Sequence, residues 1–553
     1  MRLRRWSELI RQIAGISLAS LAGWASSPAD QARQHARDVE RALRSAQRVL
    51  HAWLAQADPL TLLLPDRLPG GRGTEGRPYH RVYTPHNSGA DLYPYLILTA
   101  RITDPEIYHG RMLEMLRNEV RYTTVLDSLP ADFDLEKHVP AQPSIFGAAE
   151  YAKDGLLAVT ELLGRTPWFE RMRELTRDMM RHCSVKTRWG PLPGTGAEIN
   201  GDALQVLVRL AAMDRDLSWR QWARGIADAY VEEILPRSNG LPVEEWDFAT
   251  QSGSKRCRLR DHGNEAIVGL TLLYALEAEE QTPYARRYEP AIRKMLDQVL
   301  ASANPDGFLY ESIDVDSLRP VRDTLSDNWG YVYGAVYAFF QSTGDPSYRE
   351  ATLKVLRALP KYLGHNWGST SFDELADSIE GALYLLAREP VQEAFQWVEK
   401  ETQRLMSLQR PDGFIERWYG EGNYNRTLLL YVMWKTQGIL PDPWTPGLEL
   451  GAARTNDGLI VFVNRPARVR FDFPRHRLVI GFRKNYARLN EFPEWYAVEP
   501  NWLYRLRDAR GVEQVRLGSE LVAGIQLPEG LTTVEPLGPP PYAQKASPVR
   551  TEH

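Results

Sequence analysis

The stretch Asn304-Pro305-Asp306-Gly307-Phe308 follows a charged helical segment, and it recurs almost unchanged as Arg410-Pro411-Asp412-Gly413-Phe414 after another charged segment. Pro-Asp-Gly is a strong turn signal, because proline presets the backbone of the turn and glycine accepts conformations that other residues avoid. In both places the sequence predicts that the chain reverses from one helix toward the next. Two such turns at matching points of a helical pattern indicate a structural repeat.

Helical apolar spacing extends outward from these turns over residues 30–438, in alternating pairs of segments. The first member of each pair is rich in charge and is predicted at 30–57, 105–123, 167–184, 217–235, 283–302, 346–363 and 390–408. The second member is richer in glycine, alanine and aromatic residues and is predicted at 88–102, 146–163, 198–213, 262–279, 328–342, 374–388 and 423–437. The charged helices suit a solvent-facing outer layer, and the others suit close packing around a central axis.

Polar residues recur in the second set with a period that is typical of repeat proteins. The reference positions lie 48, 63, 62, 50 and 48 residues apart and are Asp154, Asp202, Glu265, Asp327, Asp377 and Asn425. A helical solenoid would have such a period, but the modest number of pairs favours a ring that closes on itself. We therefore predict a mostly α fold, an (α/α) toroid of six to seven helical hairpins.

The character of the sequence changes after residue 438. Three prolines indicate a linker: Pro441, Pro443 and Pro446. Strand-like runs follow at 459–463, 469–473, 478–482 and 521–527. We expect the toroid over residues 27–440, a small C-terminal antiparallel β domain over 445–537 and a disordered tail over 538–553.

Composition excludes several classes of protein. Apolar residues make up 43% and charged residues 25% of the 553 residues, which is ordinary for a globular chain. The formal net charge of −4 gives no bulk attraction for nucleic acid, so no nucleic-acid partner is expected. The two cysteines, Cys183 and Cys257, are too few for a disulfide scaffold or a four-thiolate zinc site.

Residues 1–26 have the layout of a secretory signal, because three arginines precede the apolar run 13–25. An amphipathic N-terminal helix is the alternative, since Glu8 and Arg11 place charge close to that run. We therefore expect a secreted or periplasmic protein. No later stretch reaches the roughly 20 apolar residues that span a bilayer, so stable membrane insertion of the mature protein is not expected.

Polar clusters begin the second member of most pairs. They lie at 150–154, 198–202, 261–265, 326–329, 377–380 and 421–425. Spacings of three or four residues put both polar groups of a cluster on one helix face, so several acids are expected to converge on one cavity. Each cluster alone could be a helix cap that complements the helix dipole. Their recurrence beside glycines and aromatic residues favours a shared site.

With this layout the chain resembles the α/α-toroid superfamily of carbohydrate-active enzymes, which includes the six-hairpin glycosidases and the toroid polysaccharide lyases. Many of these enzymes carry an appended β domain. The resemblance covers roughly residues 30–535 and lies in the repeat layout and in the composition of the inner helices, which are rich in glycine, alanine and aromatic residues. It implies a glycan-processing enzyme, with an oligo- or polysaccharide substrate and a cleft at one end of the ring.

Glycoside hydrolysis needs one protonated carboxyl at the leaving oxygen and one carboxylate that activates water or attacks the sugar. We predict Asp261 and Asp327 as this catalytic pair, because they begin adjacent inner helices. The residues predicted to bind substrate are His86, Asn87, Glu198, Asp202, His262, Asn264, Asn328, Trp329, Tyr331, Asp377, Glu380 and Asn423. No cofactor and no metal ligand is predicted. Bound calcium is an alternative role for the ring of acids, although no EF-hand spacing is present.

β-Elimination of a uronate polysaccharide is the main alternative activity. The segment 79–91 concentrates histidine, arginine and asparagine before an inner helix, and with His262 and Tyr331 it could supply a base and a group that offsets the uronate charge. In that alternative a histidine or a tyrosine removes the proton, and the candidate residues are His86, His262 and Tyr331. A sugar epimerase and a non-catalytic glycan-binding protein are further alternatives.

The stretch from Lys255 to Arg260 holds four cations in six residues, just before the predicted catalytic Asp261. Guanidinium groups bind carboxylates and sulfates well, so this stretch could bind charged sugars at the mouth of the cleft. A solvated loop is the alternative.

Overall fold

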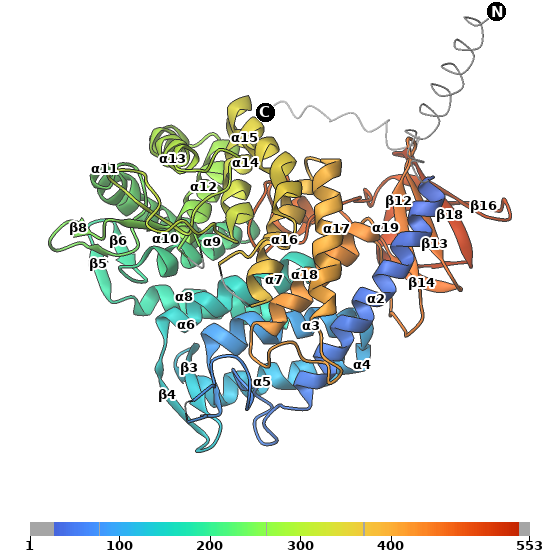
Figure 1. Cartoon of the computed structure of the whole chain (residues 1–553), viewed down its shortest axis with the longest axis horizontal. Coiled ribbons are helices and arrows are strands. Elements are labelled where there is room, and N and C mark those ends of the chain that lie inside the picture. The colour runs from blue at the N-terminus through green and yellow to red at the C-terminus, as the bar shows by residue number, and fades with distance from the viewer. Residues whose placement is uncertain (1–26, 77, 261–262, 369–370, 541–553) are drawn as a thin grey trace, which may run out of the picture.

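The computed structural model describes residues 27–76, 78–260, 263–368 and 371–540. The predicted signal segment, Asp261, His262 and residues 541–553 of the predicted tail lie outside these ranges. Helices dominate the described chain, and strands gather mainly in its C-terminal part (Figure 1). Across the described ranges, no helix combines the length and the apolar character that crossing a bilayer requires.

Seven helical segments form the outer layer of the described chain. They are α2 (Pro28–Leu54), α4 with η2 and α5 (Pro105–Ile107, Tyr108–Met112, Leu113–Thr123), α8 (Pro167–His182), α10 with η4 and α11 (Leu217–Ala229, Tyr230–Ile234, Leu235–Arg237), α13 (Pro283–Ala301), α15 with η5 (Pro346–Ala358, Leu359–Tyr362) and α17 (Gln392–Ser407). Proline stands in the first turn of five of these segments, where its missing N–H loses no helical hydrogen bond. The charged segments predicted from the sequence are therefore confirmed as helices.

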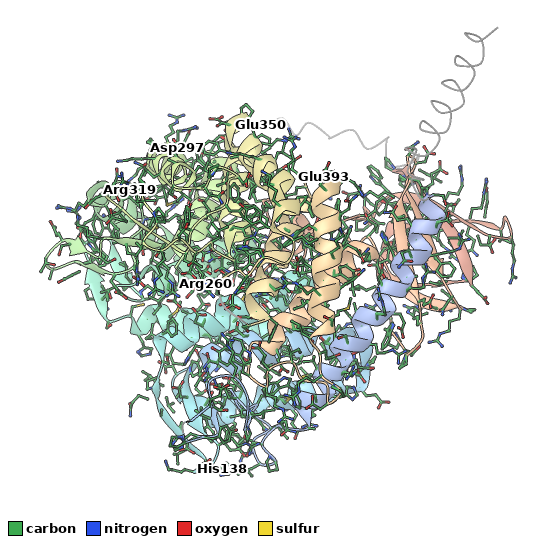
Figure 2. The ribbon with its side chains drawn as sticks, in the orientation of Figure 1. His138, Arg260, Asp297, Arg319, Glu350 and Glu393 are labelled. Atoms are coloured by element: carbon green, nitrogen blue, oxygen red, sulfur yellow. The ribbon has the colours of Figure 1, made fainter. Side chains whose placement is uncertain are left out.

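Seven inner segments alternate with the outer ones in the described chain. They are η1 with α3 (Pro85–Leu92, Tyr93–Thr103), α6 with η3 and α7 (Ile145–Glu150, Tyr151–Leu156, Leu157–Leu163), α9 (Ala197–Met213), α12 (Glu265–Glu279), α14 (Trp329–Thr343), α16 (Asp373–Leu386) and α18 (Glu421–Lys435). Each inner segment contacts the next, and α18 contacts α3 and η1, so the ring is closed. The predicted toroid is confirmed, with seven hairpins. Side chains fill the space between the two layers and form one large apolar core (Figure 2).

Glycine lets neighbouring inner helices approach closely. A Cβ atom added to Gly330 of α14 would lie 2.4 Å from Cα of Gly381 in α16. A Cβ atom added to Gly201 of α9 would lie 2.3 Å from the backbone nitrogen of Ala266 in α12. Both distances are far below van der Waals contact, so the spacing of the ring depends on these glycines.

Substitution of Gly330 by alanine is expected to lower the free energy of unfolding by about 1–3 kcal/mol, because α14 and α16 must move apart. Gly334 lies one turn further along α14 and has no atom within 4 Å of an added Cβ. Gly334→Ala is therefore the matched control and should raise stability by about 0.5–1 kcal/mol, since alanine is the better helix former. Urea unfolding of both variants checks this, and equal effects would contradict it.

The C-terminal part forms two small antiparallel sheets, as the sequence predicts. The larger has the order β12 (Leu450–Arg454), β13 (Leu459–Val463), β18 (Gly530–Gly538), β15 (Leu503–Asp508) and β16 (Glu513–Leu517), and the smaller has the order β11 (Leu440–Pro441), β14 (Ala467–Arg470) and β17 (Ile525–Leu527). The outer helix α2 packs along β12 and β13 (Figure 1). His35 of α2 lies 2.8 Å from the carbonyl oxygen of Ala452, so the first helix and the sheet are joined. The predicted domain boundaries stay a prediction.

The individual strands were less predictable than the helices. The strand at 459–463 is confirmed as β13, whereas the one at 469–473 overlaps β14 only at its start. The strand predicted at 478–482 is wrong, because a π-helical turn, η6 (His476–Ile480), occupies this stretch and Gly481 ends it with a φ of 96°. The first half of the strand predicted at 521–527 is also wrong. There Glu520 accepts a hydrogen bond from the Leu517 amide and opens α19 (Gly518–Ala523), which precedes β17.

Short β-strands occupy connections that lead from an outer helix to the next inner one. They comprise β1 (Val82–Tyr83), β2 (Thr124–Leu126), β3 (Leu129–Asp134), β4 (Val139–Pro143), β5 (Val185–Thr187), β6 (Gly190–Leu192), β7 (Trp246–Asp247), β8 (Ser252–Gly253), β9 (Arg256–Arg258) and β10 (Ser312–Asp314). Some form hairpins, and some, such as β1 with β3 and β9 with β10, are paired between different connections. All of them lie at the end of the ring where the inner helices begin. This end therefore carries the most elaborate loops, which is where binding residues are usually placed.

Candidate active site

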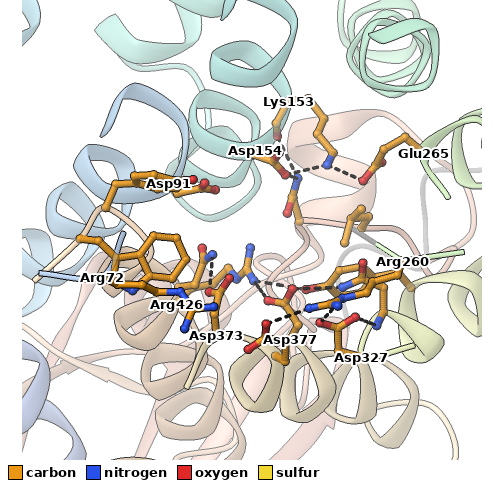
Figure 3. A pocket seen from close by; sticks show the side chains of 18 residues that line it. Arg72, Asp91, Lys153, Asp154, Arg260, Glu265, Asp327, Asp373, Asp377 and Arg426 are labelled. Atoms are coloured by element: carbon orange, nitrogen blue, oxygen red, sulfur yellow. Dashed lines mark hydrogen bonds and ion pairs between the residues drawn. The ribbon is translucent and has the colours of Figure 1, made fainter. Parts of the chain in front are cut away.

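A cavity of about 420 Å³ opens at the end of the ring where the inner segments begin (Figure 3). Its lining residues come mostly from the first turns of inner helices and from the loops before them. They are Arg72, Asp91, Lys153, Asp154, Arg260, Glu265, Asp327, Asn328, Tyr331, Asp373, Glu374, Asp377, Trp418, Tyr419, Asn423, Arg426, Leu489 and Asn490. Polar residues near the starts of several inner helices thus line the same cavity.

Acidic groups outnumber basic ones in this cavity. Among the described lining residues, seven carry a carboxyl group and four carry a cationic group. Carboxylates in the first turn of a helix are stabilised by the helix dipole, which explains why α16 tolerates three acids in two turns. Asp373, Asp377 and Asp327 lie on one side, and Asp91 and Asp154 face them from the other (Figure 3). The charge of the lining therefore favours neutral or cationic ligands over anionic ones.

Lys153 of η3 is the cation of one wall. Its Nζ lies 2.6 Å from Oε1 of Glu265 and 2.7 Å from Oδ1 of Asp154. Burial opposes the charge of Lys153, but Asp154, Glu265 and Asp202 outweigh that effect and raise its pKa well above the ordinary value. The ammonium group is therefore permanent, and it favours the charged form of the Asp154 carboxyl.

A pair of acids lies buried beneath Lys153. Asp202 of α9 is inaccessible to solvent, and its Oδ1 lies 3.8 Å from Nζ of Lys153. Burial raises the pKa of Asp202 to about 8, against the opposing effect of Lys153. Burial also raises the pKa of Glu150 well above its ordinary value, and the nearby Asp202 adds to this. Near neutral pH the folded protein therefore holds a proton at this pair that the unfolded chain releases.

The stability of the protein is expected to fall with rising pH more steeply than that of an Asp202→Asn variant. The folded pKa of Asp202 is raised, so its contribution is complete below the unfolded value of about 4 and is lost as the pH rises through about 8. The difference between the two proteins should change by more than about 1 kcal/mol over this window. Urea unfolding at pH 5, 7 and 9 measures it. Parallel pH curves would contradict the raised pKa.

Arg260 joins three acids on the opposite wall. Its Nη1 lies 2.6 Å from Glu311, its Nη2 lies 2.8 Å from Glu374, and its Nε lies 3.3 Å from Oδ2 of Asp327. The backbone N–H of Asn328 donates to Oδ1 of Asp327 over 2.9 Å. The Arg260 guanidinium and the Asn328 amide thus contact one oxygen each of the Asp327 carboxyl group at the cavity wall.

Arg426 of α18 is the third cationic centre. Its Nη2 lies 2.7 Å from Oδ1 of Asp377 and also pairs with Glu380, while Asn328 donates to the other oxygen of Asp377 over 3.0 Å. Glu380 is inaccessible to solvent, and burial raises its pKa to about 7 despite Arg426. Tyr331 donates to Glu380 over 2.7 Å, and burial raises the pKa of Tyr331 well above its ordinary value. Tyr331 is consequently a poor base.

Asp373 differs from the other acids of the cavity. Asn423 donates to its Oδ1 over 3.0 Å, which favours the charged form. Burial and the neighbouring charges of Asp377, Asp91 and Glu374 outweigh this donor and raise the pKa of Asp373 well above its ordinary value. Asp373 therefore retains its proton where an ordinary aspartate has lost it, as a general acid must.

The bottom of the cavity is closed by the C-terminal part of the chain. Residues 485–491, here called the floor segment, place Leu489 and Asn490 in the cavity lining. Asn490 donates from Nδ2 to the carbonyl oxygen of Lys153 over 2.9 Å and to Oδ1 of Asp154 over 3.2 Å. Its φ of 61° is one that asparagine tolerates better than most residues. The floor segment thus orients Asp154.

Buried ion pairs hold the floor segment against the inner helices. Arg488 contacts Glu161 of α7 through Nε at 2.8 Å and Nη2 at 2.7 Å. Arg209 of α9 donates to the carbonyl oxygen of Leu489 over 2.6 Å, and Arg388, just after α16, lies 2.7 Å from Glu491. Four segments of the ring and of the C-terminal part therefore meet at one buried polar network.

Five residues predicted to act in the site meet in this cavity. They are Asp327, Asn328, Tyr331, Asp377 and Asn423. Asp202 and Glu380 lie directly beneath it, covered by Lys153 and Arg426. Asp261 and His262 lie outside the described residues. The catalytic roles assigned from the sequence stay predictions.

Other predicted site residues lie away from the cavity. Trp329 is fully buried and donates from Nε1 to Ser378 over 2.8 Å, and Asn264 is buried at the start of α12. Asn87 donates to Asp66, and Nδ1 of His86 lies 3.9 Å from Asp132.

Glu198 lines a separate cavity of about 300 Å³ instead of the candidate active site. That cavity also includes Glu244 and Glu245 from the connection before α12. Glu198 is therefore not among the described lining residues of the candidate active site, and its predicted role in substrate binding stays a prediction.

The cavity also contains residues that sequence reasoning did not select. Asp154 and Glu265 stand in the recurring polar clusters, so the signal for them was present in the sequence. Asp373 precedes Asp377 by one helical turn, which places both on the same face. Asn490 had no local signal, because it belongs to a loop of the C-terminal part.

No metal centre is built from the described residues. Within those ranges no group of three or more histidine, cysteine, aspartate or glutamate side chains is arranged to hold an ion. The cavity's carboxylates pair instead with Lys153, Arg260 and Arg426.

The fold and the cavity together define an α/α toroid with an acid-rich cavity at one end of its ring. No family model matches the chain, and no curated protein matches it. Solved structures do match. An α-1,6-mannanase from Salegentibacter sp. HEL1_6 shows 11% identity and a TM-score of 0.40 and covers 57% of this chain and 95% of its own.

Two further solved structures are similar over comparable lengths. An unsaturated glucuronyl hydrolase from Bacillus sp. GL1 shows 14% identity and a TM-score of 0.37, covering 52% of this chain and 85% of its own. A sugar epimerase from a ruminal bacterium shows 11% identity and a TM-score of 0.41, covering 58% of this chain and 86% of its own. The toroid predicted from the repeat layout is shown by the closed ring of seven hairpins itself.

Proposed function

We propose that the protein is a glycoside hydrolase that cleaves an oligo- or polysaccharide with two carboxyl groups of this cavity. Asp373 is the general acid, and Asp154 on the facing side is the carboxylate that activates water or attacks the sugar. One observation carries the proposal: a single cavity holds a carboxyl that retains its proton opposite a carboxylate paired with a permanent cation. Glycoside hydrolysis needs two carboxyl groups whose surroundings favour opposite protonation states, one protonated and one charged.

In this mechanism Asp373 donates its proton to the glycosidic oxygen as the bond to the anomeric carbon breaks. Positive charge develops on the sugar ring, and the carboxylates of Asp327 and Asp377 stabilise it. Asp154 assists the attack on the anomeric carbon, and Lys153 and Asn490 keep its carboxyl group oriented. Asp327 is the second candidate for the role of Asp154, because its carboxyl group also lies at the cavity wall.

The remaining lining residues suit a sugar. The side chains of Trp418 and Tyr419 can stack on a sugar ring through their aromatic faces. Asn328, Asn423 and Asn490 supply amide groups for sugar hydroxyls. The excess of acids supports a neutral sugar at the bond that is cleaved.

β-Elimination has less support. Within the described chain no histidine lines the cavity, and His86 lies beside Asp132 instead. Tyr331 does line it, but its hydroxyl is bound to Glu380 and its pKa is raised. A uronate at the reacting position would also face mainly carboxyl groups.

The first experiment incubates the purified protein with neutral and uronic-acid glycans and follows reducing ends and ultraviolet absorbance together. We expect new reducing ends without absorbance from an unsaturated uronate. Reducing ends with that absorbance would establish β-elimination, and binding without turnover on every glycan would contradict an enzyme. Asp154→Asn should abolish turnover, whereas Asp297→Asn on the outer helix α13 (Figure 2) should not.

A further inference from the structure

A second cavity, of about 320 Å³, adjoins the candidate active site. Four arginines line it, and the cavity is here called the arginine groove: Arg256, Arg258, Arg260 and Arg322. Arg260 belongs to the lining of both cavities, so its side chain is the wall between them.

The periodicity of a β-strand puts three of these arginines on one face. β9 pairs with β10 in antiparallel register, with Cα of Cys257 opposite Ile313. Cys257 and Leu259 are inaccessible to solvent and point into the core. Alternate residues of a strand point to opposite faces, so the arginines on either side of them line the groove together. The run of four cations predicted from the sequence is thus more than a solvated loop.

Arginines outnumber carboxyl groups in the lining of the groove, although Arg258 lies 4.0 Å from Glu244 and Arg260 also binds Glu374 and Asp327 on the side of the acid-rich cavity. Glu311 is the one carboxyl group among its described lining residues, and it is bound by Arg260 over 2.6 Å. Arg256 lies 2.7 Å from Glu244, a residue outside the lining. Arg322 reaches the groove from the loop before α14, is exposed, and forms no ion pair with any residue in the described ranges. An anion in the groove would gain Arg322 as a partner without breaking an existing pair.

We propose that the arginine groove binds an anionic substituent, a carboxylate or a sulfate ester, carried by the glycan that the cavity acts on. Guanidinium groups bind both kinds of anion through paired N–H donors, and several guanidinium groups in one groove strengthen the binding. The inference rests on the proposed function for the glycan and adds a second binding site to it. A neutral sugar then lies in the acid-rich cavity while the charged substituent lies beyond Arg260.

Binding, rather than turnover, tests the groove. The full-length protein carrying Asp373→Asn, a substitution outside the groove, is titrated calorimetrically with two pairs of probes that differ in charge. One pair is an oligogalacturonate and its methyl-esterified form, and the other is a sulfated galactan oligosaccharide and its desulfated form. We expect the charged member of at least one pair to bind about 10-fold more tightly, with a preference that weakens at high salt.

Two arginine variants assign the preference to the groove. Arg322→Gln should raise the Kd of the charged probe about 10-fold and leave that of the neutral probe unchanged. Arg319→Gln is the matched control, because Arg319 belongs to the same exposed loop but does not line the groove (Figure 2). Far-ultraviolet circular dichroism confirms that both variants fold.

Several outcomes would overturn the inference. They are equal affinity within both probe pairs, an Arg322→Gln variant with unchanged affinity, and equal losses in Arg322→Gln and Arg319→Gln. The proposed function is tested separately. If the wild-type protein cleaves no glycan but the charge preference depends on Arg322, the anion-binding role of the groove is supported and the hydrolase activity is contradicted. The relative affinities of the two charged probes distinguish a carboxylate from a sulfate.

Discussion

Asp373→Asn is expected to lower kcat on a cleavable glycan by about 10²- to 10⁴-fold, because the general acid is lost while the amide keeps the shape of the side chain. The pH profile should change as well. The general acid must be protonated, so on the alkaline side of the profile wild-type activity should fall as the pH rises through the raised pKa of Asp373. The variant has no such group and should lack this fall. Steady-state rates from pH 4 to pH 10 measure both effects.

The control for this prediction is Asp297→Asn, which changes a carboxyl that accepts a hydrogen bond from Tyr348 between two outer helices. Its kcat and pH profile should equal those of the wild type. A kcat of Asp373→Asn within tenfold of the wild-type value, at every pH, would transfer the acid role to another carboxyl of the cavity.

Glu161→Gln is expected to lower the free energy of unfolding by about 3–5 kcal/mol, because it removes the buried anion that pairs with both Arg488 and Arg209 and leaves Arg488 with Glu491 alone. The side chains of Glu161, Arg488 and Arg209 are at most 1% exposed, so water cannot replace the lost charge. Urea unfolding monitored by circular dichroism measures the effect. Activity should fall too, because Arg488 holds the segment that orients Asp154.

Glu513→Gln is the control for the buried pair. Glu513 pairs with Arg507 on the solvent side of the C-terminal sheet, where both side chains are about half exposed. Removal of an exposed pair costs at most about 1 kcal/mol. A loss in Glu161→Gln no larger than that in Glu513→Gln would show that the floor segment is held by other contacts.

The helical ring could be predicted because each hairpin carries its own local signals. Prolines at the starts of outer helices, glycines in inner helices and the Pro-Asp-Gly turns all act within one hairpin. The boundaries of α9, at 197–213, differ by one residue from the prediction at 198–213. Around residue 480 a run of apolar residues predicts a strand, but Gly481 and the packing of η6 against α7 and α9 favour a helical turn instead.

The site was harder to predict, because its chemistry depends on which side chains meet. Asp327 and Asp377 were recognisable as polar residues on inner helices, but nothing local distinguishes them from Asp202, which lies one layer deeper. The proton on Asp373 depends on three neighbouring acids and on burial, which are properties of the assembled cavity. The role of Asn490 depends on a contact between residues more than 300 positions apart.

The position of the floor segment in the sequence also affects when the cavity can be completed during protein synthesis. All seven hairpins precede the floor segment in the chain. When the ring has just been synthesised, Asp154 therefore still lacks its contact with Asn490, and Glu161 still lacks its contact with Arg488. At typical rates of protein synthesis, the roughly fifty residues between the end of α18 and the end of the floor segment take about 3–10 s to emerge. During that interval Glu161 has Arg209 of the ring as a partner but lacks the two hydrogen bonds from Arg488. The final ordering of α7, α9 and the cavity is therefore coupled to the synthesis of the floor segment.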